Sequence, residues 1–145
     1  MKRLLVSACL LGADCKYSGG NNALDPDALR ALKESWALVP VCPELSGGLS
    51  VPRVPSERRA ERVVSREGAD VTAAFEKGAA VACRLCERFG CRTALLKENS
   101  PSCGSGSIYD GSFSGTLVPG DGRTADRLRA RGVALFGASE TDKLI

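Results

Sequence analysis

The most informative stretch of this chain for its fold is Arg3-Leu-Leu-Val-Ser-Ala-Cys-Leu-Leu-Gly12, in which a short apolar run ends at a cysteine and a glycine soon follows. Such a run, bounded by turn residues, predicts a buried strand over residues 3–9. Two more cysteines also follow short apolar runs. Cys42 ends the apolar run 37–42 in Val41-Cys-Pro-Glu44, and Cys103 lies in Ser100-Pro-Ser-Cys-Gly104, just beyond the run 92–97. Cysteines that repeatedly follow strands predict sulfur at one rim of a sheet.

Strands and helices alternate along the rest of the chain. Apolar residues at helical spacing predict a helix over residues 70–89 that ends at Gly90, and Asp25-Pro26 predicts the start of a helix over residues 25–35. The remaining expected elements are strands over 37–42, 92–97 and 133–136 and a helix over 124–131. This order predicts an α/β fold: a single compact domain over residues 1–145, with a mostly parallel, Rossmann-like sheet and helices on its faces.

Three segments lack this regular alternation. Residues 43–55 contain three prolines and two glycines, which predicts an irregular loop without a regular helix. Residues 108–113 predict a hairpin or a tight turn around Asp110-Gly111. Arginines and glutamates alternate over residues 53–67, a pattern typical of a solvated helix face rather than of an RNA-binding stripe.

Composition excludes several functional classes. The chain of 145 residues has no histidine, which excludes Ser-His and Cys-His hydrolases and removes the commonest general base. A net charge of +3 is too small to steer the protein onto nucleic acid or a membrane, so neither partner is expected. The chain has seven cysteines, an odd number, and no signal-peptide pattern. Together these features predict a reduced, cytoplasmic protein.

The chemistry of converging thiols leaves two kinds of site open. Ligands of parallel α/β sheets bind beyond the carboxyl ends of the strands, so Cys9, Cys42 and Cys103 are expected to meet there. A structural zinc site would need a fourth ligand, which Cys15 could supply, whereas an iron–sulfur cubane on three cysteines leaves one iron open. Spacing alone does not decide between them. The remaining thiols, Cys83, Cys86 and Cys91, follow a helical pattern that favours a structural role over a second metal site.

Several sequence blocks occur in a characteristic order. They are Val6-Ser-Ala-Cys-Leu-Leu-Gly12 with Cys15-Lys-Tyr17, Cys42-Pro-Glu44 with Gly47-Gly-Leu49, and Ser100-Pro-Ser-Cys-Gly104 with Ile108-Tyr-Asp-Gly111. Together they resemble the DUF523 family, which includes thiouracil desulfurases. The resemblance implies a 4Fe-4S cluster on Cys9, Cys42 and Cys103, an acid/base role for Glu44, and Ser102 beside the reacting centre. Cys15 also belongs to the family pattern and is a possible further ligand.

The residues fit the reaction that this resemblance implies. Replacing a thiocarbonyl sulfur by oxygen needs a thiophilic centre and an activated water, and Glu44 lies two residues after a proposed ligand. The expected enzyme is a non-redox desulfurase of a small thiolated nucleobase or nucleoside that releases hydrosulfide. The alternative is a non-catalytic metal- or cluster-binding module, structural or redox-sensing, in which Cys15 closes the coordination sphere. Lys97 is expected to be a solvated strand end rather than a substrate contact.

Overall fold

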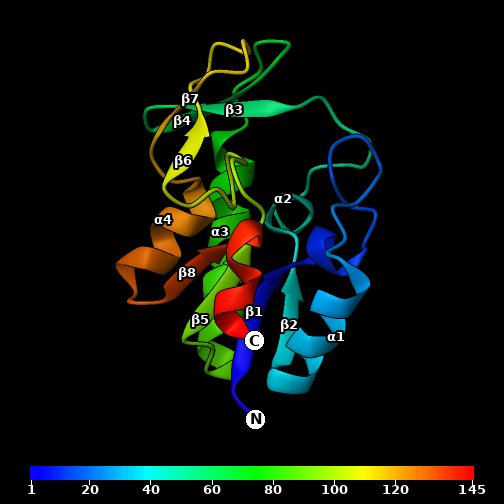
Figure 1. The fold of residues 1–145 in the computed structure, drawn as a ribbon. Helices are drawn as coiled ribbons and strands as arrows, with labels where there is room; N and C mark the ends of the chain where they lie inside the picture. Colours follow the sequence, from blue (N-terminus) through cyan, green and yellow to red (C-terminus); the bar gives the residue numbers. More distant parts are fainter.

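A parallel sheet of four strands forms the centre of the molecule, as the computed structural model of residues 1–145 shows (Figure 1). Its strands are β1 (Arg3–Ser7), β2 (Ala37–Val41), β5 (Thr93–Leu96) and β8 (Ala134–Gly137), in the order β2-β1-β5-β8. Every pairing in the sheet is parallel, and Ser7 lies opposite Val41 at the carboxyl end of β1. The predicted α/β fold with a parallel sheet is therefore confirmed.

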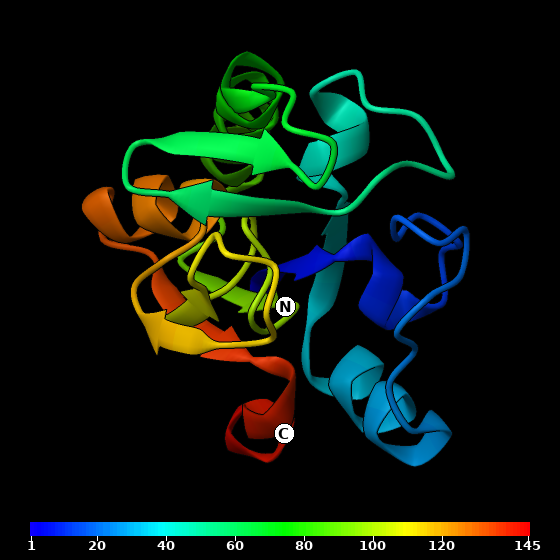
Figure 2. The same ribbon diagram turned by 90° about the horizontal axis from the view of Figure 1, so that it is seen from above.

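Helices cover both faces of this sheet. They are α1 (Pro26–Ser35), α2 (Pro43–Ser46), α3 (Thr72–Phe89) and α4 (Arg123–Ala130), with 3-10 helices η1 (Ala8–Leu11) and η2 (Ala138–Leu144). Because side chains alternate along a strand, Leu4 and Val6 pack with Leu32 of α1, whereas Leu5 packs with Ala82 of α3. Seen along the strands, α3 and α4 lie on one side of the sheet and α1 and η2 on the other (Figure 2). None of the helices is both long and apolar enough to cross a bilayer.

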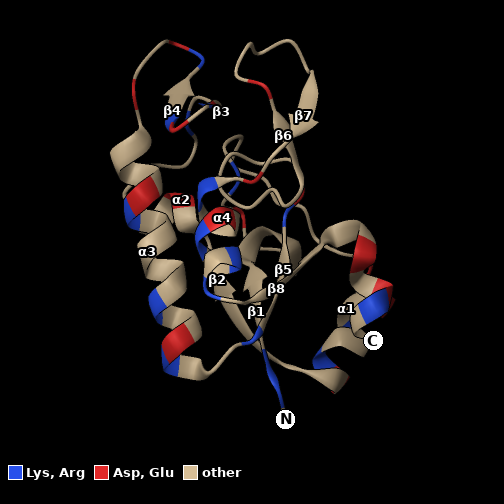
Figure 3. Cartoon of the chain, turned by 90° about the vertical axis from the view of Figure 1, so that its left-hand side faces the viewer, with Lys and Arg blue, Asp and Glu red and all other residues tan.

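Local sequence explains where α1 begins and where α3 ends. The carboxylate of Asp25 accepts hydrogen bonds from the backbone N–H groups of Asp27 and Ala28, and Pro26 occupies the first turn of α1. Helix α3 ends at Gly90, which has a φ of 65°. Charged residues lie mainly on the helices and the outer loops, while the strands of the central sheet have few of them (Figure 3).

Helices α2 and α3 cross so closely that only glycine fits at the contact. A Cβ atom at Gly78 of α3 would lie 1.8 Å from the carbonyl oxygen of Pro43, the first residue of α2. In the opposite direction, a Cβ atom at Gly47 would lie 2.0 Å from the carbonyl oxygen of Ala74. This crossing fixes α2 directly after β2, at the carboxyl edge of the sheet.

Two antiparallel hairpins stand above that edge (Figure 1). The first consists of β3 (Ser56–Arg59) and β4 (Arg62–Ser65), and the second of β6 (Ser107–Tyr109) and β7 (Leu117–Pro119). The second confirms the hairpin expected near Asp110. The first corrects the expectation of a helix. Arg59 donates to the carbonyl oxygen of Gly111 in the β6–β7 loop, and Arg58 donates to that of Asp121, just beyond β7; local charge spacing does not reveal these contacts.

The expected loop over residues 43–55 needs a smaller correction. Its first residues form the short helix α2, which begins at Pro43 because proline is well suited to the first helical turn, where its missing N–H costs nothing. Beyond Gly48 the segment is irregular, as expected.

Candidate functional site

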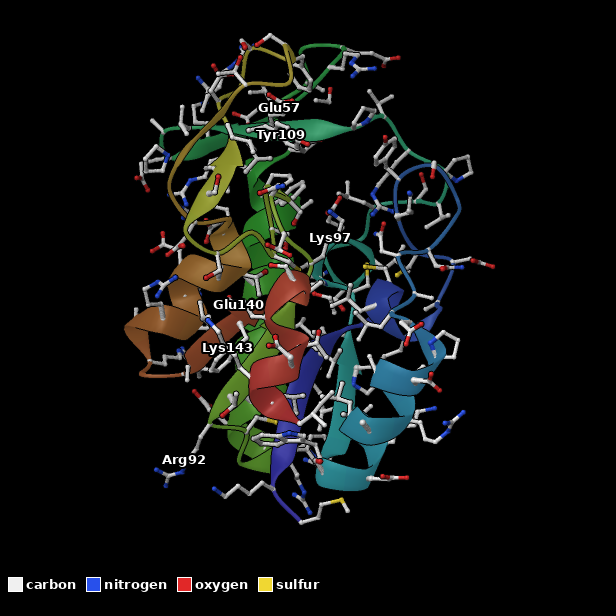
Figure 4. The ribbon with its side chains drawn as sticks, viewed as in Figure 1. Glu57, Arg92, Lys97, Tyr109, Glu140 and Lys143 are labelled. Atoms are coloured by element: carbon white, nitrogen blue, oxygen red, sulfur yellow. The ribbon has the colours of Figure 1, made fainter.

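A cavity of about 420 Å³ opens at the carboxyl edge of the sheet, lined by residues that follow the strands and by residues of the two hairpins. Its wall includes the three cysteines expected to converge, Cys9, Cys42 and Cys103, together with Cys15 and Glu44. Parallel α/β sheets bind ligands at this edge. Lys97 lies below the hairpins that carry Glu57 and Tyr109 (Figure 4), and all three residues line the same cavity.

Each of the three cysteines follows a different strand. Cys9 lies in η1, directly after β1, and Cys42 is the residue between β2 and α2. Cys103 lies in the turn after β5, where the hydroxyl oxygen of Ser100 accepts hydrogen bonds from the backbone N–H groups of Cys103 (2.6 Å) and Ser102 (3.2 Å). The sheet register therefore brings together thiols that are far apart in the sequence.

The electrostatics of the thiols show that they share one environment. Burial raises the pKa of the Cys103 thiol to about 12; the Ser7 hydroxyl opposes this rise, and Glu44, Cys9 and Cys42 add to it. Burial also raises the pKa of Cys9, against the opposing effects of Asn22 and the Lys97 ammonium. The charges of Cys9 and Cys42 both act on the Cys103 thiol, and that of Cys42 acts on Cys9, so the three thiols are neighbours in the cavity wall.

Cys15 lies beside this group. It is 5% exposed, and burial, followed by the neighbouring Cys42, raises the pKa of its thiol to about 12. The thiol of Cys42 is 3.9 Å from the backbone carbonyl oxygen of Cys15. Its position is thus compatible with the fourth-ligand role that the sequence left open.

Glu44 is held by an arginine from the segment after α2. The Nε atom of Arg53 donates to Oε1 of Glu44 at 3.0 Å, and another guanidinium nitrogen donates to the carbonyl oxygen of Cys15 at 2.9 Å. The side chains are 8% exposed for Arg53 and 20% for Glu44. Arg53 therefore joins the proposed acid/base residue to the cysteine segment, and it is not on the solvated helix face that its charge pattern predicted.

Ser102 is the one proposed site residue that the structure does not bring to the cavity. Its side chain is 1% exposed, and its hydroxyl lies 2.9 Å from the hydroxyl of Thr124 on α4. The cavity wall at this point is formed by Ser100, Pro101 and Cys103. Ser102 thus connects the turn that contains Cys103 to α4, on the side away from the cavity.

The remaining cysteines lie in the apolar core. Cys83, Cys86 and Cys91 pack with Leu5, Ala82 and Leu128 between the sheet and the helices α3 and α4. All seven cysteines are free thiols. No three Cys, Asp or Glu side chains are grouped as the ligands of a single metal ion would be.

Several residues of the cavity wall were missed by sequence reasoning. Lys97 directly follows β5, as expected, but it is half-buried, lines the cavity and donates from Nζ to the carbonyl oxygen of Glu98 at 2.7 Å, so it is less solvated than the sequence predicts. Tyr17, Arg66, Tyr109 and Phe113 also line the cavity. They lie on separate loops and hairpins, and no periodic pattern in the sequence marks them.

A model of the 2-thiouracil desulfurase family matches residues 4–140. The chain belongs to this family. The expected DUF523 resemblance is thereby confirmed.

Two proteins similar to this chain match nearly its whole length. The solved structure of the [4Fe-4S]-dependent thiouracil desulfidase TudS (DUF523Vcz) is 44% identical, with a TM-score of 0.94 over 99% of this chain and 95% of that chain. The uncharacterized protein YbbK of Bacillus subtilis (strain 168) is 37% identical over 152 aligned positions, covering 98% of this chain and 99% of YbbK. The fold is therefore that of TudS throughout.

Proposed function

We propose that the protein is a 4Fe-4S-dependent desulfurase that converts a thiolated nucleobase such as thiouracil to its oxo form. Water enters and hydrosulfide leaves, so the C=S bond is replaced by C=O and no electrons are consumed. The observation that carries this proposal is the convergence of Cys9, Cys42 and Cys103 from three strand ends on one cavity that also contains Glu44. Membership of the 2-thiouracil desulfurase family and the similarity to TudS support it.

The donor set fits an iron–sulfur cluster. Three soft thiol donors on three separate loops face a cavity whose volume is in the range of small-molecule sites, and the chain has no imidazole to compete with them. Cys9, Cys42 and Cys103 would hold the cluster, which when bound supplies a thiophilic iron with a coordination position free of protein ligands. The seven free thiols also support a reduced, cytoplasmic location for the protein.

Glu44 would act on the attacking water. Arg53 holds Oε1 of the carboxylate, so the side chain keeps one orientation in the cavity wall. A carboxylate so fixed can take a proton from water as the oxygen attacks the thiocarbonyl carbon, and then return it to the departing sulfur. The absence of histidine from the chain leaves few other groups for this task.

Lys97 would stabilise the negative charge that develops at sulfur. Its ammonium lines the cavity and already favours the thiolate form of Cys9, against the effect of burial. A fixed cation at a site partly shielded from water stabilises a developing anion more strongly than it would in bulk solvent.

The test combines the reacting residue with the ligands. Glu44→Gln should load iron and sulfide normally but lower anaerobic turnover of 2-thiouracil or 4-thiouracil by roughly 10²- to 10⁴-fold, the usual effect of losing a general acid/base. Cys9→Ala or Cys103→Ala should lose stable iron binding, whereas Cys86→Ala, the matched core thiol, should keep it. Equal rates for wild type and Glu44→Gln at equal iron content would refute the role of Glu44.

A second candidate is a non-catalytic module in which Cys15 completes the coordination. The observation that favours it is the position of Cys15 in the cavity wall, next to Cys42. Under this alternative, Cys15→Ala destroys the bound centre, and sulfide added to the wild type does not change its absorption spectrum. Under the desulfurase proposal, the centre survives Cys15→Ala, and added sulfide perturbs the wild-type spectrum.

A further inference from the structure

Phe113, in the wall of the cavity, has a strained backbone. It lies in the loop between β6 and β7, is half-buried, lines the cavity and has a φ of 57°. A bulky side chain rarely adopts this left-handed conformation, which persists only where the surroundings enforce it. The structure shows two such restraints.

The first restraint is Glu57, which reaches the loop from the other hairpin. Its side chain is buried, and Oε1 accepts hydrogen bonds from the backbone N–H groups of Gly111 and Phe113, both at 3.0 Å. Hydrogen bonds to a carboxylate are stronger than neutral ones, and two on a single oxygen fix the orientation of the loop. Arg59 adds a bond of 2.7 Å from Nε to the carbonyl oxygen of Gly111.

The second restraint acts on the ring itself. The guanidinium carbon of Arg66, the residue after β4, lies 5.7 Å from the centroid of the Phe113 ring, within the range of a cation–π contact. Arg66 and Phe113 both line the cavity. The backbone and the ring of Phe113 are thus held separately, and both restraints come from the β3–β4 hairpin and its end.

We propose that Phe113 is a specificity residue that stacks on the planar ring of the substrate, and that Glu57 is the residue that positions it. The proposal rests on the proposed function, because the cysteines at the strand ends and Phe113 in the hairpin bound the same cavity from different sides. Aromatic side chains stack on every nucleobase because each base presents a π-face. The site therefore selects planar, aromatic thiolated heterocycles over thioamides that lack such a ring.

The experiment compares two ligands that differ by saturation of the C5–C6 bond, which removes the planarity of the ring. 2-Thiouracil and 5,6-dihydro-2-thiouracil share the thiocarbonyl and both N–H groups, but the second has a puckered, non-aromatic ring. In wild type, KM should be lower for the planar compound. Phe113→Leu should raise KM for 2-thiouracil by roughly 5- to 100-fold, the effect of removing one base-stacking side chain, while leaving KM for the dihydro compound nearly unchanged.

Binding measured without turnover gives an independent readout. Calorimetry with uracil, on reconstituted protein at matched iron content, should show the same weakening for Phe113→Leu, and Phe113→Tyr should restore the affinity. Glu57→Met should behave like Phe113→Leu, whereas Glu57→Gln, which keeps an acceptor oxygen, should retain most of the binding. Phe89→Leu is the matched control, because Phe89 is another partly exposed ring under an arginine, Arg3, at the end of α3.

The outcomes separate this inference from the proposed function. Turnover by wild type together with an unchanged KM ratio and unchanged uracil affinity in Phe113→Leu would overturn the stacking role alone. Uracil binding that depends on Phe113, without turnover of any thiolated base, would overturn the desulfurase proposal and leave the stacking role standing. Loss of binding in Glu57→Gln as severe as in Glu57→Met would overturn the positioning role of Glu57.

Discussion

Replacement of Gly78 by alanine should change the stability of the protein, and helix propensity and tertiary packing predict opposite signs for that change. In an isolated helix the change is favourable by about 1 kcal/mol, because alanine has the highest helix propensity and glycine one of the lowest. At the crossing with α2, however, the new Cβ would lie 1.8 Å from the carbonyl oxygen of Pro43 and 2.6 Å from its carbonyl carbon. Those atoms are backbone, so no side-chain rotation relieves the overlap.

The structure indicates which effect is larger. To restore ordinary contact at 3.4 Å, α2 and α3 must separate by roughly 1.6 Å. Overpacking that forces such a backbone shift costs about 3 kcal/mol, the upper end of the usual range. After the gain of about 1 kcal/mol in helix propensity, we expect Gly78→Ala to lower the free energy of unfolding by about 2 kcal/mol. Because α2 follows Cys42 and carries Glu44, the same shift should also lower the iron content after reconstitution.

Urea unfolding of the iron-free protein, followed by circular dichroism, measures the first effect, and anaerobic iron and sulfide analysis measures the second. Lys77→Ala is the matched control: Lys77 is the exposed neighbour of Gly78 on α3, and its removal should change stability by less than about 0.5 kcal/mol. A Gly78→Ala protein that is more stable than wild type and binds iron normally would refute the reasoning.

Two further predictions concern arginine anchors and acid stability. Arg53→Lys should destabilise the protein by about 2 kcal/mol and slow turnover, because one ammonium cannot replace the guanidinium bonds to both Glu44 and the carbonyl oxygen of Cys15. A variant whose urea midpoint and turnover rate equal those of wild type would contradict this. Burial disfavours the charged form of Asp121, but hydrogen bonds from Arg129 and the Gly106 N–H outweigh it and keep the pKa of its carboxyl below the ordinary value. The resulting stabilisation is complete above about pH 4 and is lost as the pH falls through the folded pKa, so Asp121→Asn should flatten the acid-side fall of the urea midpoint; an unaltered pH dependence would count against it.

The parallel sheet and the ends of its strands could be predicted from the sequence because their signals are local. Apolar runs such as the one before Cys9 mark buried strands, and Gly90 marks the end of α3. The rule that ligands bind at the carboxyl ends of parallel strands then placed the three cysteines at one edge. The structure brings them to a single cavity there.

The cap above that edge could not be predicted, because long-range contacts form it. Arg58 and Arg59 look solvated in sequence, yet they bind the carbonyl oxygens of Asp121, just beyond β7, and of Gly111, in the β6–β7 loop. Ala60 lies in the turn between β3 and β4 with a φ of 52°. An alanine in the sequence does not predict this left-handed conformation. Lys97 and Phe113 enter the cavity wall for the same reason: their surroundings come from distant parts of the chain.

The dispersal of the three cysteines over separate strand ends has a consequence for the order of assembly. An unfolded chain offers only isolated thiols, and a chelating set exists only after β1, β2 and β5 have paired. The sheet is held by apolar packing on both faces, with most of that packing remote from the cavity. If the three cysteines hold the cluster as proposed, its insertion follows folding, and the folded protein without a cluster keeps its thiols arranged for a new one.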